Sequence, residues 1–300
     1  MSGPRDSALF DARLQRLHRA RAARRFVHEA FLVRRAAEDL AERLEAIPRR
    51  FERALILGAP ALFVEALAAR PALKERIGAL EKADVVAELA DGGAGIDLDH
   101  LPYAEQAFDL IVSPLLLHQA NDLVGMLIQL KRALKPDGLL LASLFGGATL
   151  NELRTALLQA EIEIKGGAGP RVAPFADVID LAGLLQRAGY ALPAADRDQI
   201  VVRYREPLTL LTDLRAMGET NALMQRAGPL TRGVLARALQ IYRERFPHPD
   251  GGVAATFEIV TLTGWAPHES QQKPLKPGSA QTRLADALGV LETKLPREIE

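Results

Sequence analysis

Apolar segments of strand length alternate with segments suited to helices along the central part of the chain. The strand-like segments are "RALILGA", "RIGALEKADVV", "GIDLDHLPY", "FDLIVSPLLL" and "GLLLASLFGG", and the helical stretches lie near 60–70, over 121–138, from Thr149 and over 175–190. This alternation is typical of a parallel sheet that helices cover on both faces. Within it, Asn121 is expected to cap the helix over 121–138, and Gly189 to end the helix over 175–190. The sequence therefore predicts an α/β fold with a doubly wound sheet.

The alternation changes after residue 190. "DQIVVRYR" alternates apolar and polar residues like a strand, residues 207–246 suit helices, and "ATFEIVTLTGWA" suits a long final strand. We expect three regions: basic N-terminal helices over 1–50, a main domain over 51–266 with a helical insertion at 207–250, and a polar, proline-rich tail over 267–300. The composition of the tail is typical of disorder.

The first fifty residues carry twelve arginines, no lysine and seven acidic residues. The arginine content of "FDARLQRLHRARAARRF" is typical of a mitochondrial targeting helix. The alternative is a surface helix that covers the domain, with its arginine stems packed and their charged heads in water. We favour the surface helix because a second helical segment, "FVHEAFLVRRAAEDLAERLEAI", follows without a gap suited to cleavage.

Composition and charge argue against several classes of protein. The 38 basic and 38 acidic residues cancel, so the basic excess of a nucleic-acid-binding protein is missing. The chain has no cysteine, which excludes disulfides, cysteine nucleophiles and thiolate metal sites. The six histidines lie well apart, so no metal site is expected. No apolar run reaches the roughly 18 residues of a membrane span, and the first residues lack the apolar segment of a signal peptide.

Candidate ligand-binding residues follow the predicted strands. In a doubly wound sheet, ligands bind beyond the carboxyl ends of the strands. A carboxylate after the second strand can accept hydrogen bonds from ribose hydroxyls, and one after the third can pair with an adenine amino group. In chain order these residues are the loop Gly58-Ala59-Pro60-Ala61, Glu81 or Asp84, Asp97 with Leu98, Ser113, and the segment "LLLHQAND" with His118.

This order of residues resembles a class I S-adenosylmethionine-dependent methyltransferase, and several segments resemble a narrower family. "LPYAEQAFDLIVSPLLLHQANDLVGMLIQLKRALKPDGLLLASLFGGATLNELR" is similar to its block LPF…FDLV.S.LSLHWVNDLP….LKPDG.F…FGG.TL.ELR. "LLTDLRAMGETNAL", "FEIVTLTGWAPHESQQKPLKPGSA" and the opening "LFDARLQRLHRARAA" also match. The family is that of the respiratory complex I assembly factors, which are related to the BioC-type methyltransferases. The resemblance covers about residues 9–280.

The resemblance implies a Rossmann-like, seven-stranded class I methyltransferase fold that binds S-adenosylmethionine. It places Gly58, Asp84, Asp97, Leu98 and Ser113 in the cofactor site. It also implies a protein substrate or partner, such as an iron–sulfur subunit of complex I, because the mitochondrial branch is linked to hydroxylation of an arginine there. Since the family motif already begins at Leu9, we expect a bacterial cytoplasmic member, which its partner would bring to the inner membrane.

The loop after the first strand departs from the family's LGCG.G pattern. Glycines in such a loop permit a positive φ and let the cofactor approach the backbone. Pro60 has no N–H to donate, although it suits the first turn of a helix. Two or three lost contacts of about 1–3 kcal/mol each would weaken binding on the order of 10²–10⁵-fold. The residues therefore leave open whether the cofactor still binds.

Two further groups carry open alternatives. His118 orients a substrate or is a loop histidine satisfied by a neighbour; it is the candidate catalytic residue. Glu219 and Asn221 in "MGETN" line a substrate pocket or cap neighbouring helices, and capping is slightly favoured.

Three functions remain. The leading hypothesis is a methyltransferase-like protein that acts on a protein subunit during assembly of complex I, with S-adenosylmethionine if the loop still holds it. The second is a non-catalytic assembly or chaperone factor that has lost the cofactor. The third is a BioC-type acyl-carrier methyltransferase, which the family-specific FGG-TL-ELR segment and the tail disfavour.

Overall fold

The computed structural model describes residues 8–226 and 228–272. The chain divides into two units, residues 1–267 and 268–300. The second unit is described only over 268–272, where the Ser270 N–H donates to Nδ1 of His268. The tail predicted over 267–300 thus lies almost wholly outside the described residues. Every helix and strand of the described residues belongs to the first unit.

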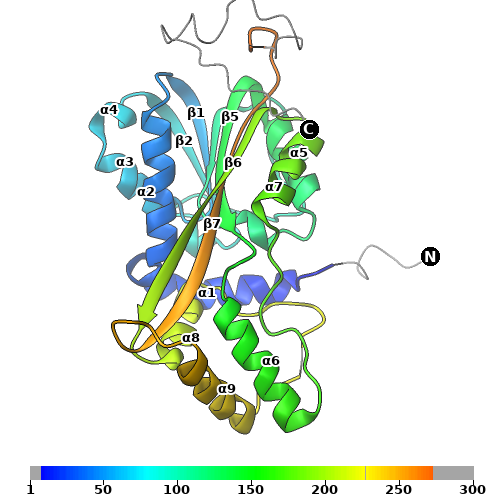
Figure 1. Ribbon diagram of the computed structural model, residues 1–300. Coiled ribbons are helices and arrows are strands. Elements are labelled where there is room, and N and C mark those ends of the chain that lie inside the picture. Colours follow the sequence, from blue (N-terminus) through cyan, green and yellow to red (C-terminus); the bar gives the residue numbers. More distant parts are fainter. Residues whose placement is uncertain (1–7, 227, 273–300) are drawn as a thin grey trace, which may run out of the picture. The chain divides into compact units, whose positions relative to one another are not determined.

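A seven-stranded sheet forms the centre of the first unit (Figure 1), in the order β3-β2-β1-β4-β5-β7-β6. Strands β1 to β5 are parallel, β7 runs antiparallel to β5, and β6 runs antiparallel to β7. The fold predicted from the sequence is confirmed. The strands are β1 (Phe51–Leu57), β2 (Ile77–Asp84), β3 (Ala94–Gly95), β4 (Phe108–Ser113), β5 (Leu134–Phe145), β6 (Ala191–Tyr204) and β7 (Val253–Trp265).

Helices cover both faces of this sheet and gather at its carboxyl edge. Helices α2 and α3 lie on one face and α5 and α7 on the other, while α1, α6, α8 and α9 lie at the lower end of the sheet in Figure 1. Their bounds are α1 (Ala12–Glu29), α2 (Phe31–Glu45), α3 (Pro60–Ala68), α4 (Pro71–Lys74), α5 (Leu123–Ala133), α6 (Asn151–Lys165), α7 (Val178–Arg187), α8 (Pro207–Ala216) and α9 (Arg232–Arg245).

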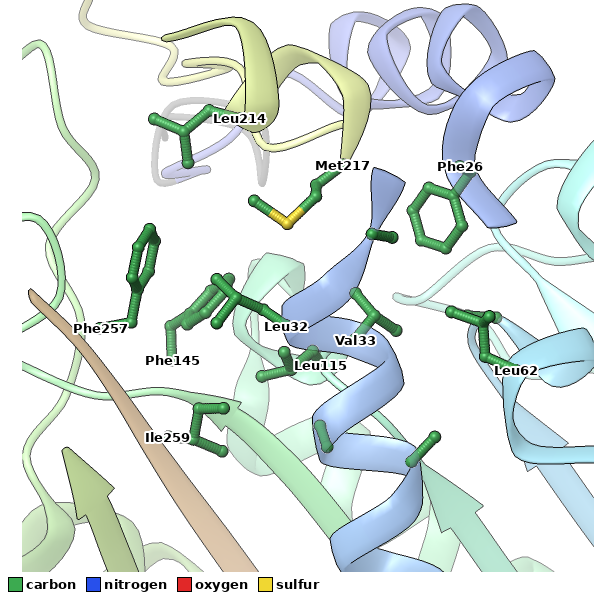
Figure 2. Packing of buried hydrophobic residues seen from close by; sticks show 14 of the residues in the cluster. Phe26, Leu32, Val33, Leu62, Leu115, Phe145, Leu214, Met217, Phe257 and Ile259 are labelled. Atoms are coloured by element: carbon green, nitrogen blue, oxygen red, sulfur yellow. The ribbon is translucent and has the colours of Figure 1, made fainter. Parts of the chain in front are cut away.

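Two hydrophobic cores follow from the alternation of side chains along the central strands. Ala54 and Ile56 of β1 belong to one core, whereas Leu55 and Leu57 belong to the other, because successive residues of a strand point to opposite faces. The first core continues past the end of the sheet: Figure 2 shows residues of α2, β5 and β7 packed near α8. The labelled residues there are Leu32, Val33, Phe145, Phe257, Ile259, Leu214 and Met217. Phe26 of α1 and Leu214 of α8 belong to this core, so both helices are packed at the carboxyl edge of the sheet.

Of the two helix ends predicted by residue, one differs from the structure and one is confirmed. The N-cap of α5 is Asp122, whose side chain accepts from the Gly125 N–H at 2.8 Å. Asn121 is not the cap, because its amide binds the backbone of Phe10 instead. Between β2 and β3 the short segment holds only a single 3₁₀ turn, η1 (Ala87–Leu89). The C-terminal stop after α7 is confirmed, since Gly189 has a φ of 78°.

Candidate functional site

The carboxyl edge of the sheet brings three of the predicted residues together. Gly58 follows β1, Asp84 ends β2 and Ser113 ends β4. The Gly58 N–H donates to the Ala83 carbonyl at 2.8 Å, so the loop lies directly against the end of β2. Ser113 is fully buried and donates its hydroxyl to the Leu57 carbonyl at 2.8 Å. Its hydroxyl proton therefore already has a partner within the protein.

The alternative to Asp84 lies elsewhere. Glu81 belongs to the middle of β2, where its carboxylate pairs with Arg53 of β1 at 2.8 Å. Asp84, at the end of the strand, is the acid that reaches the ligand-binding edge.

Asp84 is completely buried and bound by an arginine of α1. Arg19 donates from Nε to Oδ1 at 3.0 Å and from Nη2 to Oδ2 at 2.7 Å. The Ala59 N–H also donates to Oδ2, at 2.9 Å. Arg19 itself is 2% exposed, and its guanidinium lies over the Phe26 ring at 5.5 Å. The expectation that the arginine heads of this helix stay in water is wrong for Arg19, because a buried carboxylate replaces water as its partner.

The charge of this arginine is maintained by its partner. Burial acts most strongly, and it opposes the charged form. The charge of Asp84 and its two hydrogen bonds nevertheless raise the pKa of Arg19 above its ordinary value, with a smaller contribution from Glu219. The charged guanidinium of Arg19 thus makes a two-point contact of the strong kind with Asp84.

Other residues on the same face of α1 bind the same edge. Gln15 donates to the Gln119 carbonyl at 2.9 Å, and Arg16 pairs with Asp97 at 3.2 Å. His18 Nδ1 lies 3.2 Å from the Thr220 carbonyl oxygen. Figure 1 shows α1 running across the end of the sheet. The edge at which a doubly wound sheet binds its ligand is therefore covered by the chain's own helix.

The predicted adenine site contains little space. Asp97 is half exposed and Leu98 is buried. Between these residues and α1 lies a cavity of about 10 Å³, bordered by Ala12, Gln15 and Arg16. This is about the space that one water molecule needs.

The loop after β1 has a strained conformation. Gly58 has a φ of 94°, and a Cβ there would lie 2.8 Å from Cβ of Leu116, so glycine is required. Ala59 also has a positive φ, 46°, before Pro60 begins α3. An L-residue in the left-handed region costs roughly 1–2 kcal/mol.

Replacing the strained alanine should stabilise the protein. We expect Ala59→Gly to raise the free energy of unfolding by up to about 1 kcal/mol, because relief of strain exceeds the entropy that glycine adds to the unfolded chain. The matched control is Ala182→Gly in α7, which should lower it by about 1 kcal/mol. Urea denaturation of both variants measures this. If Ala59→Gly lowers the free energy of unfolding as much as the control does, the backbone of Ala59 is not strained.

A larger cavity of about 330 Å³ lies beside this covered edge. Its walls are mainly apolar and come from η2 (Leu117–Gln119), β5, α6, β7, α8 and the loops 171–175 and 218–222, together with Phe10, Gln15 of α1 and Leu230. Figure 2 shows three wall residues, Phe145, Phe257 and Leu214, near one another in the core. The volume and the apolar walls are typical of a site for a small molecule or an inserted side chain.

Three polar residues meet at one side of this cavity. Glu219 lies 3.2 Å from Nε2 of His118, and it accepts from Nε2 of Gln119 at 2.9 Å. Because a carboxylate can only accept, Nε2 of His118 carries a proton in this contact. Nδ1 of His118 and Oε1 of Gln119 are buried and have no hydrogen-bond partner among the described residues. Oε1 of Gln119 is an acceptor, and Nδ1 of His118 is an acceptor when the imidazole is neutral.

Glu219 is largely buried, with 15% of its side chain exposed. Burial is the strongest influence on its pKa and acts upward. His118, Arg19 and Gln119 together outweigh it and hold the pKa of Glu219 below its ordinary value. The cavity therefore ends on an ionised carboxylate, and beside it lie Nδ1 of His118 and Oε1 of Gln119, two buried atoms without a hydrogen-bond partner among the described residues. The preference for helix capping by Glu219 and Asn221 is wrong: Glu219 binds η2, and both residues line the cavity.

Another wall of the cavity depends on a buried ion pair. Glu161 of α6 accepts from Arg171 at 2.6 Å and from Lys165 at 3.0 Å, and also from the Gly169 N–H. Hydrogen bonding to Arg171 is the main cause that lowers the pKa of Glu161 to about 2. These contacts hold the loop that carries Arg171 and balance its charge.

This pair should make stability depend on pH. Because the folded pKa of Glu161 is depressed, its stabilisation is complete above the unfolded pKa of about 4.5 and is lost as the pH falls toward 2. We expect Glu161→Gln to be less stable than the unaltered protein at pH 7 and the difference to shrink between pH 4.5 and 2. Urea denaturation at several pH values measures it. A difference that stays constant over this range would contradict the assignment.

Comparisons with known proteins agree with this geometry. Residues 78–142 match the family described as "Methyltransferase domain". The structure of a putative methyltransferase from Bacillus halodurans has the same fold, with a TM-score of 0.52 and 11% identity, over 77% of this chain and 99% of that one. Fold and matched domain together define a class I methyltransferase-fold protein.

Sequence relatives narrow the class. Human mitochondrial arginine-hydroxylase NDUFAF5 is 37% identical, over 98% of this chain and 87% of its own length. A malonyl-[acyl-carrier protein] O-methyltransferase of Halorhodospira halophila is 33% identical, over 87% of this chain and 90% of its own. The chain belongs to the NDUFAF5 family of respiratory complex I assembly factors, which is related to the acyl-carrier methyltransferases.

The residues at the carboxyl edge do not fit S-adenosylmethionine, the cofactor that this fold family implies. A ribose would have to bind Asp84, yet both of its carboxylate oxygens already accept from Arg19, and Oδ2 also accepts from Ala59. The adenine position beside Asp97 and Leu98 is filled by α1. The cofactor could enter only if α1 moved away.

Proposed function

We propose that this protein is an assembly factor for respiratory complex I that holds an arginine side chain of a protein subunit in the 330 Å³ cavity. The observation that carries this proposal is the ionised carboxylate of Glu219 at the cavity, which lies beside the His118 imidazole and beside the buried Oε1 of Gln119, an acceptor without a hydrogen-bond partner among the described residues. A guanidinium has five N–H donors and no acceptor, so it matches such a group. The aliphatic stem of an arginine also suits the apolar walls.

The relatives support the same choice of side chain. The human relative is named an arginine-hydroxylase, and the segment similarity of this chain to complex I assembly factors includes the "MGETN" segment that supplies Glu219. An iron–sulfur subunit of complex I is the partner that this resemblance implies. The proposed place of action is the bacterial cytoplasm, at the inner membrane through that partner. Among residues 8–226 and 228–272, no helix is long and apolar enough to span a bilayer.

The proposal does not require S-adenosylmethionine. The acceptors belong to His118, Gln119 and Glu219, and none of these lies in the loop after β1. The acyl-carrier methyltransferase alternative needs the cofactor for its reaction, so the poor fit of the carboxyl edge disfavours it.

Site-specific photocrosslinking tests this function. Leu230 lines the cavity and is 38% exposed, and Ile128 of α5 has the same exposure but does not line the cavity. A photoreactive residue at Leu230, in cells that assemble complex I, is expected to crosslink one complex I subunit, identified by mass spectrometry. The crosslink should map near an arginine and be missing for Ile128. Crosslinks to complex I subunits that are equal at both positions, or none at Leu230, would contradict the proposal.

A further inference from the structure

The side chains of α1 that bind the carboxyl edge share one helical face. Gln15, His18 and Arg19 have the i, i+3, i+4 spacing of such a face, and Arg16 lies at its border. The partners of Gln15, Arg16, His18 and Arg19 are Gln119, Asp97, Thr220 and Asp84. These partners come from the ends of β2 and β3, from η2 and from the loop after α8. One helix thus contacts several of the segments that would surround a nucleotide.

Arg19 is the residue of α1 that binds Asp84, the carboxylate at the end of β2. In doubly wound nucleotide-binding folds, a carboxylate in the position of Asp84 accepts hydrogen bonds from the ribose hydroxyls. Here the same carboxylate accepts two parallel N–H groups of one guanidinium, at 3.0 and 2.7 Å. The planar fork of arginine offers two donors to the two carboxylate oxygens, as a ribose diol would.

The helix is fastened along its length and fits closely. Phe10, just before α1, exchanges two backbone hydrogen bonds with the Asn121 amide, and the Asp11 N–H donates to the Ala222 carbonyl. A Cβ at Gly218 would lie only 3.2 Å from Cγ and 3.3 Å from Cα of Arg19. Near the other end of α1, Phe26 is buried. These contacts hold α1 against the rest of the first unit on both sides of Arg19.

We propose that α1 is an internal ligand of the former cofactor site: Arg19 takes the place of the ribose on Asp84, and the protein keeps the methyltransferase fold without binding S-adenosylmethionine. The altered loop agrees with this. Ala59 contributes its N–H to Asp84, and Pro60 starts α3, so the loop serves the Arg19–Asp84 pair and needs no further glycines. The inference does not rest on arginine binding, because its central pair is Arg19 with Asp84, and neither lines the 330 Å³ cavity. The two sites are neighbours: Gln15 of α1 lines the cavity, and Arg19 lowers the pKa of Glu219.

Isothermal titration with S-adenosylhomocysteine and S-adenosylmethionine tests the inference. The full-length, unaltered protein is expected to show no binding up to about 1 mM. Binding with a Kd below about 1 mM would overturn the inference, because a ribose on Asp84 would have to displace Arg19 from the same carboxylate.

Two variants isolate the part that Arg19 plays. The first, Ala59→Gly with Pro60→Gly, restores glycines but keeps Arg19; the second adds Arg19→Ser. The second is expected to bind S-adenosylhomocysteine at least about tenfold more tightly than the first. Equal affinity, or equal lack of binding, in two variants that circular dichroism shows to be folded would overturn the role of Arg19.

If the variant with Arg19→Ser does not fold, amide hydrogen exchange of the unaltered protein gives a second test. Exchange in α1 should be the same with and without millimolar S-adenosylmethionine. Faster exchange of α1 when the compound is added would show that the helix is displaced by cofactor, and would overturn the inference.

Discussion

Asp84→Asn should destabilise the protein by about 3–5 kcal/mol. The substitution keeps the shape of the side chain and an oxygen for the Ala59 N–H, but it leaves the buried, charged Arg19 without its counter-charge. Removing one partner of a buried ion pair has an effect of this size, because the remaining charge stays out of water. Urea denaturation followed by circular dichroism measures the change. In a methyltransferase with an open cofactor site, the same substitution would affect cofactor binding far more than stability.

Two variants control this prediction. Arg19→Met combined with Asp84→Asn should recover most of the lost stability, since an apolar side chain of similar length needs no counter-charge. Glu105→Gln removes one partner of the exposed Arg132–Glu105 pair and should change stability by less than about 1 kcal/mol. A change below about 1 kcal/mol in Asp84→Asn, or no recovery in the double variant, would contradict the described pair.

Glu219→Gln should abolish most of the assembly function. A hydrogen bond to a charged group contributes about 1.5–3 kcal/mol, so loss of the carboxylate should weaken binding of an arginine side chain on the order of 10²-fold. In a strain that lacks the gene, the variant should restore little more assembled complex I than an empty vector. Native gels and the NADH oxidation rate of membranes measure this.

The matched control is Glu163→Gln, on the outer side of α6. Glu163 pairs with Arg237 and does not line the cavity. This variant should support complex I assembly at the level of the unaltered gene. If Glu219→Gln is folded and supports full assembly, the cavity is not the site at which the partner is held.

The fold was predictable because its evidence is local in the sequence. Central parallel strands are buried on both faces, so segments such as 110–112 and 139–142 are continuously apolar. The order of the candidate acids was predictable for a similar reason: Asp84 directly ends its strand, and a strand end defines its place at the edge of the sheet.

The partners of those acids could not be predicted from local patterns. Arg19 and Asp84 are 65 positions apart, and Arg19 is one of twelve arginines in a segment whose other members look alike in the sequence. Which arginine becomes buried depends on how α1 crosses the sheet. His118 and Glu219 are 101 positions apart. The sequence marks each of them as a candidate, one after the fourth strand and one in "MGETN", but only the fold shows that they form one site. Gln119 carried no signal, because the family pattern has tryptophan there.

A crystal structure of the full-length protein grown with millimolar S-adenosylhomocysteine shows directly whether α1 has replaced the cofactor on Asp84. We expect that Arg19 still binds both oxygens of Asp84, that α1 still covers the carboxyl edge, and that no S-adenosylhomocysteine lies there. Electron density for S-adenosylhomocysteine with its ribose on Asp84, and with Arg19 displaced, would contradict it and would return this protein to the cofactor-binding methyltransferases.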